Sequence, residues 1–518
     1  MHHASEIRLT DEQRAVVEST EDIMAVTAFA GTGKTSTLRA FAASRPRERI
    51  LYVAFNRSLA DESKVAFASC RNVEVRTIHS LAWSQVGRRY QGGLGELKAF
   101  DLVPFLGLKK FSPNDRPYEL ARIAQEVLHE WMISSKRTLP EFFKERKRWV
   151  SSKLAGHKAT NGALAKIVGR IWEDMVAGKF TMPHNGYLKL FQLDNGGRLG
   201  WYDRILVDEA QDLNDCMISL LLGNDSKKIF VGDPYQQIYA FNGAVDALGK
   251  ARAEGAAPYY LTQSFRCPDD VAEKANQYLK LLGSEKTFRG LPKPRPANRS
   301  CQKLVVARTN AGLFDHISKN LGETKYFYNG GFEGYRFDII LDIVNLIVDR
   351  PRLVNDSFLK KFKNISEVED YAIDANDTVT TTRIKIARRH MEKAFQIYSD
   401  MQRTRAAEKD ADWTATTAHK IKGQEFQNVL LLDDYSSLED VVRQARRLKL
   451  AGKKAGKASG QDNCLVSLEE FRLLYVAMTR SRMALEAPRS YLIQDALINE
   501  FKDLVSEGFI VTTDDVFK

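Results

Sequence analysis

Paired cysteines are missing from this sequence: its five cysteines stand singly, and no two form a C-x-x-C pair. A disulfide scaffold, a zinc ribbon and a cysteine-held iron–sulfur cluster are therefore not expected. The sequence also lacks any apolar run near the ~20 residues that cross a bilayer, and its first residues lack the apolar core of a signal peptide. These absences predict a soluble protein of a reducing compartment with no membrane partner, either cytoplasmic and nucleoid-associated or nuclear in a eukaryote.

The composition is that of a globular protein. Hydrophobic residues make up 44% and charged residues 28% of 518 residues, which excludes a mostly disordered chain. The length predicts three or four domains. With 77 Lys and Arg against 66 Asp and Glu, the net charge is +11. This surplus is compatible with a polyanionic partner but is too small for this length to establish one.

Short apolar runs rich in Val, Ile and Leu recur along the chain. Most are nearly continuous rather than alternating, which is typical of strands buried on both faces of a parallel sheet. Segments with helical spacing separate several of them, so we expect an α/β fold. The runs are Ile23–Thr27, Ile50–Phe55, Val73–Thr77, Ile205–Asp208, Ile229–Gly232, Lys303–Ala307 and Val429–Leu432.

Three stretches break this α/β rhythm. Residues 82–186 have helical apolar spacing and a basic cluster, and residues 328–410 are mixed and charge-rich, so both are predicted to be insertions. Residues 443–463 are rich in Lys, Ala and Gly and are predicted to form a basic flexible loop. For this loop, a solvated linker and a DNA-contacting segment are both open interpretations.

A phosphate-binding loop is the strongest local signal. Residues 23–36 read IMAVTAFAGTGKTS, in which a strand ends in a glycine-containing loop and a helix is expected to begin near Thr35. Gly31 and Gly33 would let successive N–H groups point at phosphate oxygens. Lys34 would supply charge to the β- and γ-phosphates, and the Thr35 hydroxyl suits Mg²⁺. The residues predicted to bind the phosphates are Ala30, Gly31, Thr32, Gly33, Lys34, Thr35 and Ser36.

An acidic pair follows a later apolar run. In RILVDEAQD, residues 204–212, Asp208 would bind the metal and Glu209 would polarise the attacking water. An acidic helix N-terminus is the alternative interpretation. Residues 229–244 then join a buried strand to a turn with amide and aromatic side chains, which suit a phosphate and a nucleobase respectively.

These and further motifs together resemble the superfamily 1 DNA helicases of the UvrD/Rep/PcrA type. Among them, the sequence is most similar to the helicase part of the F-box DNA helicases. The motifs follow the family order across nearly the whole chain, at residues 9–13, 23–36, 52–60, 77–82, 204–212, 232–244, 261–266, 417–426 and 473–480.

The resemblance implies how ATP is bound and hydrolysed. Gln13 would read the adenine, Phe265 would stack on it, and Glu425 would bind the ribose. Thr35 and Asp208 would hold Mg²⁺. The predicted catalytic residues are Lys34, Glu209, Gln236, Arg266 and Arg480. Within this set Gln236 would sense the γ-phosphate and Arg266 would reach it.

Arg480 would act as the arginine finger, supplied by the second domain. It ends the motif LLYVAMTR, which is predicted on a helix with Ser467 and Glu470 as a capping box. Val476 and Arg480 lie one turn apart, so the guanidinium is expected to leave the core at the helix end. The apolar face of this predicted helix contains Leu468, Phe471, Leu474, Tyr475 and Met478.

The resemblance also implies contacts with DNA. The expected residues are Phe55, Asn56, Thr77, His79, Tyr239, Phe241 and His419. Phe241 replaces the tryptophan and Asn242 the arginine that are usual in the family. Weaker stacking and one missing charged contact are therefore expected.

The expected architecture is two RecA-like P-loop domains in tandem. The first motif begins at residue 9, which is expected to leave no room for an F-box, and about 38 residues after Arg480 are expected to leave none for a nuclease domain. The predicted ranges are 1–81 and 187–270 for the first RecA-like domain, 82–186 for its helical insertion, 271–327 and 411–518 for the second, and 328–410 for a reduced second insertion.

The predicted activity is that of an ATP-dependent DNA helicase or translocase, with ATP and Mg²⁺ as cofactors. The resemblance implies 3′→5′ movement by a monomeric core on single-stranded DNA and its junctions with duplex DNA, and recombination or repair proteins as partners. Three alternatives stay open: an RNA-directed motor or RNA–protein remodeller, a translocase that strips proteins from DNA, and a non-catalytic nucleic-acid-binding or partner-recruiting protein. The intact ATP-site set disfavours the last.

Overall fold

The chain forms two compact units. The first contains Met1–Ala28 and Gly33–Leu261, and the second contains Phe29–Thr32 and Thr262–Lys518. The first unit thus ends before the predicted domain boundary at residue 270. The computed structural model describes residues 9–98, 101–102, 117–157, 159–194, 199, 201–239, 243–293, 302–322, 324–374, 377–450 and 464–512.

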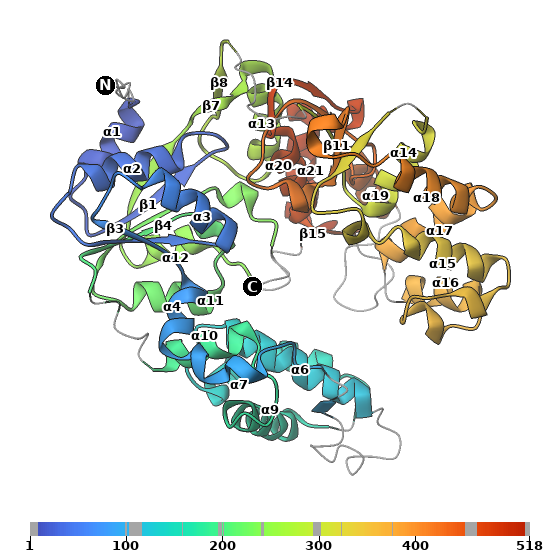
Figure 1. Cartoon of the computed structure of the whole chain (residues 1–518), viewed down its shortest axis with the longest axis horizontal. Helices are drawn as coiled ribbons and strands as arrows, with labels where there is room; N and C mark the ends of the chain where they lie inside the picture. The colour runs from blue at the N-terminus through green and yellow to red at the C-terminus, as the bar shows by residue number, and fades with distance from the viewer. Residues whose placement is uncertain are drawn as a thin grey trace. The chain divides into compact units, whose positions relative to one another are not determined.

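A six-stranded sheet forms the centre of the first unit (Figure 1). Each pair of neighbouring strands in this sheet is parallel. The strands, in spatial order, are β3 (Val73–Thr77), β2 (Ile50–Ala54), β4 (Arg204–Val207), β5 (Lys227–Gly232), β1 (Ile23–Ala28) and β6 (Ala257–Leu261). Five of the seven predicted runs are therefore strands of this sheet.

The four inner strands of this sheet are buried on both faces, which explains their continuous apolar runs. Along β2, Leu51 and Val53 pack into one core cluster, whereas Ile50, Tyr52 and Ala54 pack into another. The surrounding helices are α1 (Asp11–Glu18), α2 (Lys34–Ala43), α3 (Arg57–Ala66), α11 (Asp215–Leu222) and α12 (Ala247–Ala253).

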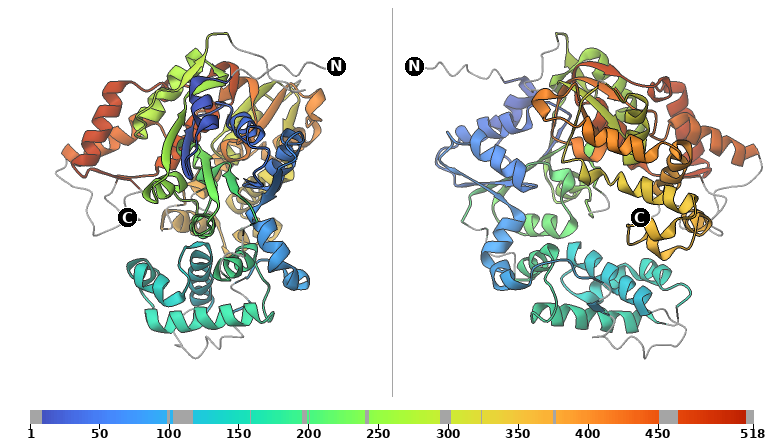
Figure 2. Two further views of the ribbon diagram at one scale, coloured as in Figure 1. Left: turned by 90° about the vertical axis from the view of Figure 1, so that its left-hand side faces the viewer. Right: turned by 45° about the vertical axis from the view of Figure 1, so that its right-hand side comes forward.

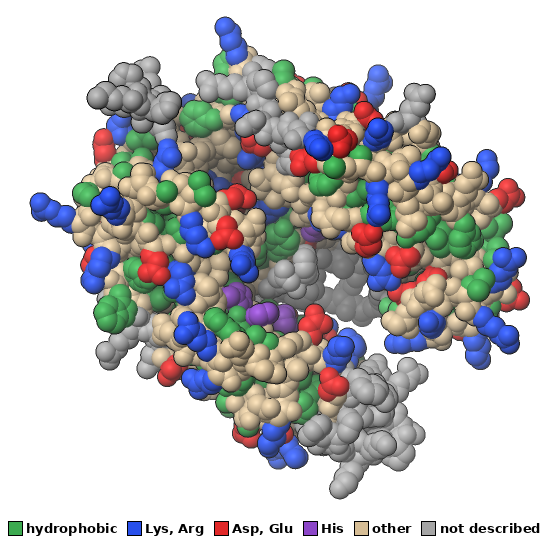
Figure 3. All heavy atoms as spheres, in the orientation of Figure 1, with side chains coloured by type: hydrophobic (Ala, Val, Ile, Leu, Met, Phe, Trp, Pro, Cys, Tyr) green, Lys and Arg blue, Asp and Glu red, His purple; other side chains and the backbone are tan. Residues whose placement is uncertain are grey.

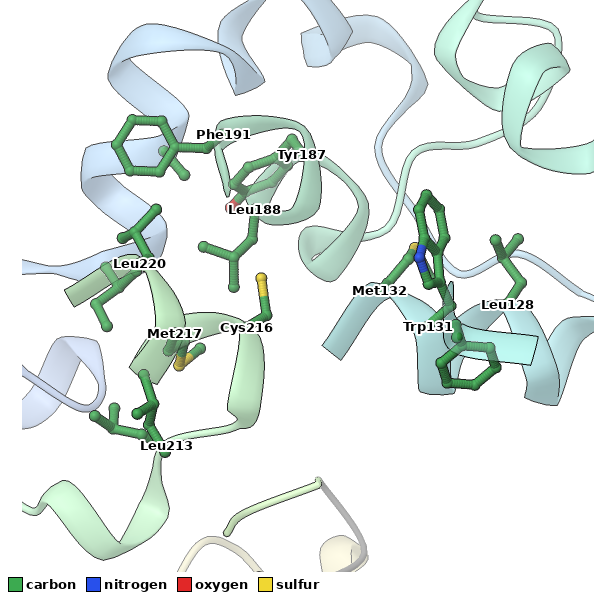
Figure 4. Packing of buried hydrophobic residues seen from close by; sticks show 14 of the residues in the cluster. Leu128, Trp131, Met132, Tyr187, Leu188, Phe191, Leu213, Cys216, Met217 and Leu220 are labelled. Carbon is green, nitrogen blue, oxygen red and sulfur yellow. The ribbon is translucent and has the colours of Figure 1, made fainter. Parts of the chain in front are cut away.

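The segment predicted as the first insertion is helical. Its α6 packs against α9 and α10, and α7 packs against α9, to form a bundle (Figure 2). The bundle joins the core of the sheet domain through α11: Trp131 on α6, Leu188 on α10 and Met217 on α11 belong to one buried cluster (Figure 4). The helices are α4 (Ile78–Gln85), α6 (Pro117–Ile133), α7 (Leu139–Glu145), α8 (Lys147–Lys153), α9 (Asn161–Val176) and α10 (His184–Leu193).

The second unit contains a parallel sheet of five strands. Two of its strands are the predicted runs near 303 and 429, so all seven runs are strands and the predicted α/β fold of tandem RecA-like type is confirmed. In spatial order the strands are β10 (Tyr326–Tyr328), β11 (Trp413–Thr417), β9 (Lys303–Ala307), β12 (Phe426–Leu431) and β14 (Ser481–Glu486).

Two small parallel sheets and several helices complete the second unit. The small sheets pair β7 (Gln263–Pro268) with β8 (Arg289–Leu291), and β13 (Cys464–Val466) with β15 (Ile510–Thr512). The helices are α13 (Asp269–Leu281), α14 (Asn310–Lys319), α15 (Asp338–Ile347), α16 (Ile365–Asp374), α17 (Thr378–His390), α18 (Ala394–Arg403), α19 (Leu438–Leu450), α20 (Leu468–Met478) and α21 (Asp495–Ser506). Helices α15–α18 fall within the predicted second insertion, between β10 and β11.

The prediction of a flexible loop over residues 443–463 is wrong in its first part. Residues 443–450 are the end of α19, and residues 451–463 lie outside the described part of the chain. Leu438, Val442 and Ala445 share a buried face of this helix. Its charged face is neutralised in part by ion pairs such as Arg446–Glu500 and Lys449–Glu507.

The capping box predicted before α20 is also wrong. Ser467 is the N-cap residue, but its side chain makes no capping hydrogen bond. The Glu470 carboxylate instead accepts from Nε and Nη2 of Arg308 at 2.5–2.9 Å. The Arg308 guanidinium gives this carboxylate a two-pronged, charge-assisted pair in place of the single hydrogen bond that it would accept from the Ser467 N–H.

No helix of the described residues is long and apolar enough to cross a membrane.

Candidate functional site

The phosphate loop follows the strand–loop–helix pattern that the sequence predicted. Strand β1 ends at Ala28, and α2 begins at Lys34 with Gly33 as its N-cap. Gly31 and Gly33 have φ of +69° and +80°, in the left-handed region that favours glycine. The two glycines therefore allow the tight turn that brings the loop back to the start of α2.

The apex of this loop belongs to the second unit, where it is tied to β7. The backbone N–H of Phe265 donates to the Gly31 carbonyl at 2.8 Å, and Ser264 Oγ donates to the Ala30 carbonyl at 3.0 Å. A Cβ on residue 31 would lie 2.5 Å from the Cβ of Arg266, so only glycine fits there. Thr32 closes the apex by donating from Oγ1 to the Phe29 carbonyl at 2.8 Å.

In the first unit, the start of α2 meets the acidic pair after β4. Lys34 Nζ lies 2.7 Å from Oε1 of Glu209, and Thr35 Oγ1 lies 3.5 Å from Oδ2 of Asp208. Glu209 adopts a left-handed backbone conformation with φ +50°. Non-glycine residues rarely adopt this conformation, and it is common at functional sites.

Electrostatics couple these side chains. Burial alone would lower the pKa of Lys34, but Glu209 and Asp208 outweigh it and raise that pKa. Burial raises the pKa of Asp208, helped by the neighbouring Glu209 carboxylate and opposed by Lys34. Lys34 therefore stays charged, and the site combines one cation with two carboxylates.

A chain of hydrogen bonds joins the end of β4 to the end of β5. Gln211 Nε2 donates to Oε2 of Glu209 at 2.5 Å, and its Oε1 accepts from the Asp233 N–H at 3.0 Å. Gln236 Nε2 then donates to Oδ2 of Asp233 at 2.7 Å. A Cβ on residue 232 would lie 2.4 Å from Gln211 Oε1, so Gly232 makes room for this amide.

The donor set around Thr35 and Asp208 fits Mg²⁺. Mg²⁺ prefers oxygen ligands and is usually held by one or two protein oxygens together with phosphate oxygens. A hydroxyl from α2 and a carboxylate from the end of β4 lie together here. Ser36, the last of the predicted phosphate binders, lies one residue further along α2.

In the second unit, Arg266 and Glu425 form an ion pair. Arg266 Nε lies 2.9 Å from Oε2 of Glu425, and Arg482 pairs with Oε1 of the same carboxylate. Burial would raise the pKa of Glu425, but the two arginines outweigh it and lower that pKa. The side chain predicted to bind the ribose is thus held between two guanidinium groups. Phe265, next to Arg266, is 39% exposed.

Arg480 stays in the core of the second unit, so the prediction that its guanidinium leaves the core is wrong. It is 1% exposed. Its Nε donates to the Val476 carbonyl at 2.8 Å, and its Nη1 and Nη2 reach the Gln424 carbonyl and Thr479 Oγ1, each at 3.4 Å. Helix α20 is buried on more than the one predicted face, since every residue from Leu473 to Met478 is buried.

Gln13 lies at the third position of α1 and takes part in a capping box. Its Oε1 accepts from the Thr10 N–H at 3.0 Å, and Thr10 Oγ1 accepts from the Gln13 N–H at 3.2 Å. The amide of Gln13 is therefore fixed in orientation. Its predicted contact with adenine stays a prediction.

The candidate DNA contacts of the first unit follow the carboxyl ends of β2, β3 and β5. The rings of Phe55 and Tyr239 are stacked, with centroids 6.1 Å apart and planes 14° apart. Asn56 caps α3 by accepting from the Leu59 N–H, and Thr77 caps α4 by accepting from the Ser80 N–H. Ligand sites of open α/β sheets lie at this edge.

Two histidines lie where α4 meets α10. His79 Nε2 is 3.4 Å from Asn185 Oδ1, and its ring lies edge-on to that of His184. His419, in the second unit, has Nε2 3.6 Å from Oε1 of Glu469. Phe241 and Asn242 lie outside the described residues.

On the face drawn in Figure 3, Lys and Arg alternate with Asp and Glu rather than forming one basic patch.

The structure thus groups the predicted ATP-site residues in two sets. Lys34, Thr35, Asp208, Glu209 and Gln236 form one connected network in the first unit. The second set belongs to the second unit and contains Arg266, Glu425 and Arg480. Arg266 was predicted to belong to the first domain, and the structure places it in the second unit instead. Sequence reasoning missed Tyr52, Gln211, Asp233 and Arg482, which contact members of these sets.

A parallel sheet with a glycine-containing phosphate loop after one strand, and an acidic pair after a neighbouring strand, defines the class of P-loop nucleotide-binding proteins. A family model described as an AAA domain matches residues 12–242. It covers the phosphate loop and the acidic pair.

Curated proteins are also similar to the chain. "F-box DNA helicase 1" of Gallus gallus is 29% identical over 93% of this chain and 49% of its own length. "F-box DNA helicase protein 1" of Schizosaccharomyces pombe is 27% identical over 92% of this chain and 57% of its own length. "Probable DNA helicase II homolog" of Mycoplasma capricolum is 25% identical over 64% of this chain and 49% of its own length.

These matches support the similarity to UvrD-type superfamily 1 helicases, and to the F-box DNA helicases among them, that the motifs predicted. It spans about half the length of these curated relatives.

Proposed function

We propose that the chain is an ATP-dependent DNA helicase or translocase that moves 3′→5′ on single-stranded DNA. The network of Lys34, Thr35, Asp208 and Glu209 at the carboxyl edge of the first sheet carries this proposal. It brings together the cation, the hydroxyl and the two carboxylates that phosphoryl transfer from a magnesium nucleotide requires. The names of the similar proteins support DNA as the substrate.

Binding of a triphosphate would reorganise one ion pair. Lys34 would exchange Glu209 for phosphate oxygens, while Thr35 and Asp208 would hold the Mg²⁺ that neutralises phosphate charge. Glu209, released from Lys34 but still bonded to Gln211, would accept a hydrogen bond from the attacking water. The left-handed backbone at Glu209 would aim its side chain for this role.

The loop after β5 would link the nucleotide to DNA. Gln236 is bonded through Asp233 and Gln211 to Glu209, and Tyr239 follows three positions later, stacked on Phe55. A shift of Gln236 on loss of the γ-phosphate would be passed to Tyr239 over one short segment. ATP hydrolysis could then change how tightly the two rings hold a base.

The two rings give a direct test of DNA contact. We expect Phe55→Ala and Tyr239→Ala each to weaken binding of single-stranded DNA by ~1–3 kcal/mol, because each removes an aromatic face on which a base can stack. Fluorescence anisotropy with a labelled oligonucleotide measures this. Trp201→Ala is the control, since Trp201 is 73% exposed and outside this pair. Wild-type affinity in both ring variants would remove Phe55 and Tyr239 from the DNA path.

Strand displacement tests the function itself. We expect ATP-dependent displacement from duplexes that carry a 3′ single-stranded tail, and none from duplexes with only a 5′ tail. Displacement only from duplexes with a 5′ tail would contradict the proposed 3′→5′ polarity and indicate 5′→3′ movement. ATPase stimulated by RNA but not by DNA of equal length would favour an RNA motor. Stimulation by DNA without displacement would favour a translocase that strips proteins.

A further inference from the structure

A tyrosine hydroxyl lies buried in the middle of β2. Every residue of this strand is buried, and Tyr52 is 0% exposed. Its ring packs against Phe67, with centroids 4.7 Å apart. Its hydroxyl donates to Oδ2 of Asp208, which lies 156 residues further along the chain. A buried tyrosine hydroxyl usually finds one polar partner, and here the partner is the carboxylate proposed to bind Mg²⁺.

The carboxylate of Asp208 is held at both oxygens. Oδ1 accepts from the backbone N–H of Glu209 at 2.9 Å, and Oδ2 accepts from Tyr52. Thr35 Oγ1 lies 3.5 Å from the same Oδ2. With one donor on each oxygen, the carboxylate cannot rotate about its Cβ–Cγ bond without losing a hydrogen bond.

The position of Tyr52 is itself fixed by the sheet. Strands β2 and β4 are paired in register, with Tyr52 opposite Leu206 and Val53 opposite Val207. Asp208 follows Val207 directly, and its N–H continues the pairing by donating to the Val53 carbonyl at 3.1 Å. The Tyr52 hydroxyl thus lies on β2, and the Asp208 carboxylate directly follows the adjacent strand β4. Strands position groups more rigidly than loops do.

We propose that Tyr52 is a positioning residue for magnesium-dependent nucleotide binding. Its hydroxyl holds the Asp208 carboxylate in the orientation in which Asp208 and Thr35 can serve the same Mg²⁺. This inference rests on the proposed function, because it requires a magnesium nucleotide at Thr35 and Asp208. Partners that orient metal ligands typically change metal affinity 10–100-fold when they are removed.

The substitution Tyr52→Phe tests this without disturbing the ring packing on Phe67. Binding of a fluorescent, non-hydrolysable ATP analogue is titrated with Mg²⁺ and measured separately in EDTA. We expect the Mg²⁺ concentration for half-maximal binding to rise about 10-fold in Tyr52→Phe. Affinity in EDTA should match the wild type, whereas general damage to the site would weaken binding in both conditions.

Tyr90→Phe is the matched control. Tyr90 is also buried in the first unit, and its hydroxyl donates to the Val176 carbonyl at 3.1 Å, away from Asp208. This variant should keep the wild-type Mg²⁺ dependence. Adding Tyr52→Phe to Asp208→Asn should not change the Mg²⁺ dependence of nucleotide binding any further, because Tyr52 acts through Asp208.

The outcomes separate the two proposals. Wild-type protein without Mg²⁺-dependent nucleotide binding would overturn the proposed function. Wild-type protein with that dependence, together with an unchanged Mg²⁺ titration in Tyr52→Phe, would overturn only the role of Tyr52. Additive effects of Tyr52→Phe and Asp208→Asn would also overturn it.

Discussion

Replacing Arg480 with alanine is expected to lower kcat for ATP hydrolysis by about 10³-fold or more while ATP binding changes little. An arginine finger stabilises charge that develops on the transferred phosphoryl group, and its contribution is ~10³–10⁵ in rate. The nucleotide-binding candidates Lys34 and Thr35 are untouched by this change. Steady-state phosphate release gives kcat, and a fluorescent ATP analogue gives the binding affinity.

The contacts of Arg480 suit such a role. Hydrogen bonds from its guanidinium to the Val476 and Gln424 carbonyls and to the Thr479 hydroxyl fix the orientation of the group. A cation that follows the C-terminus of α20 is also stabilised by the helix dipole.

Two further variants make the Arg480 test specific. Arg480→Lys keeps the charge but loses the planar fork, so its kcat should fall between those of the wild type and alanine. Arg443→Ala removes an exposed arginine of α19 that pairs with Glu439 and should leave kcat unchanged. If Arg480→Ala loses binding and turnover by the same factor, the arginine does not act as a finger.

The strands were predictable because their cause is local. A strand buried on both faces is apolar at most positions, as β2 is, and all seven predicted runs are strands. The phosphate loop was predictable for a similar reason, since its glycines, lysine and threonine are adjacent in sequence. Helix α19 was missed although Leu438, Val442 and Ala445 have helical spacing, because its Lys and Arg content favoured a loop.

Contacts between distant residues were not predictable from one sequence. The capping box at Ser467 failed because Glu470 pairs with Arg308, 162 residues away. The role of Tyr52 was missed because its partner is 156 residues away. A tyrosine inside an otherwise apolar strand was the available signal, since its buried hydroxyl needs a partner. The register of β2 against β4 decides which partner it finds.

Replacing Glu209 with glutamine is expected to lower kcat by about 10²–10⁴-fold, because general-base catalysis contributes that much. Glutamine has nearly the same shape and can still accept the hydrogen bond from Gln211, so the local structure should be kept. The substitution removes the ion pair with Lys34. Lys34 would then be freer to bind phosphate, so ATP should bind as tightly as in the wild type or more tightly.

Rapid-quench measurement of a single turnover separates the chemical step from product release in this variant. Glu254→Gln is the control, because Glu254 is an exposed carboxylate at the end of α12. Its substitution should leave the rate of the chemical step unchanged. A slow chemical step with tight ATP binding places Glu209 at the attacking water. A variant that hydrolyses ATP at the wild-type rate would show that Glu209 serves only as the ionic partner of Lys34, and another group would have to orient the water.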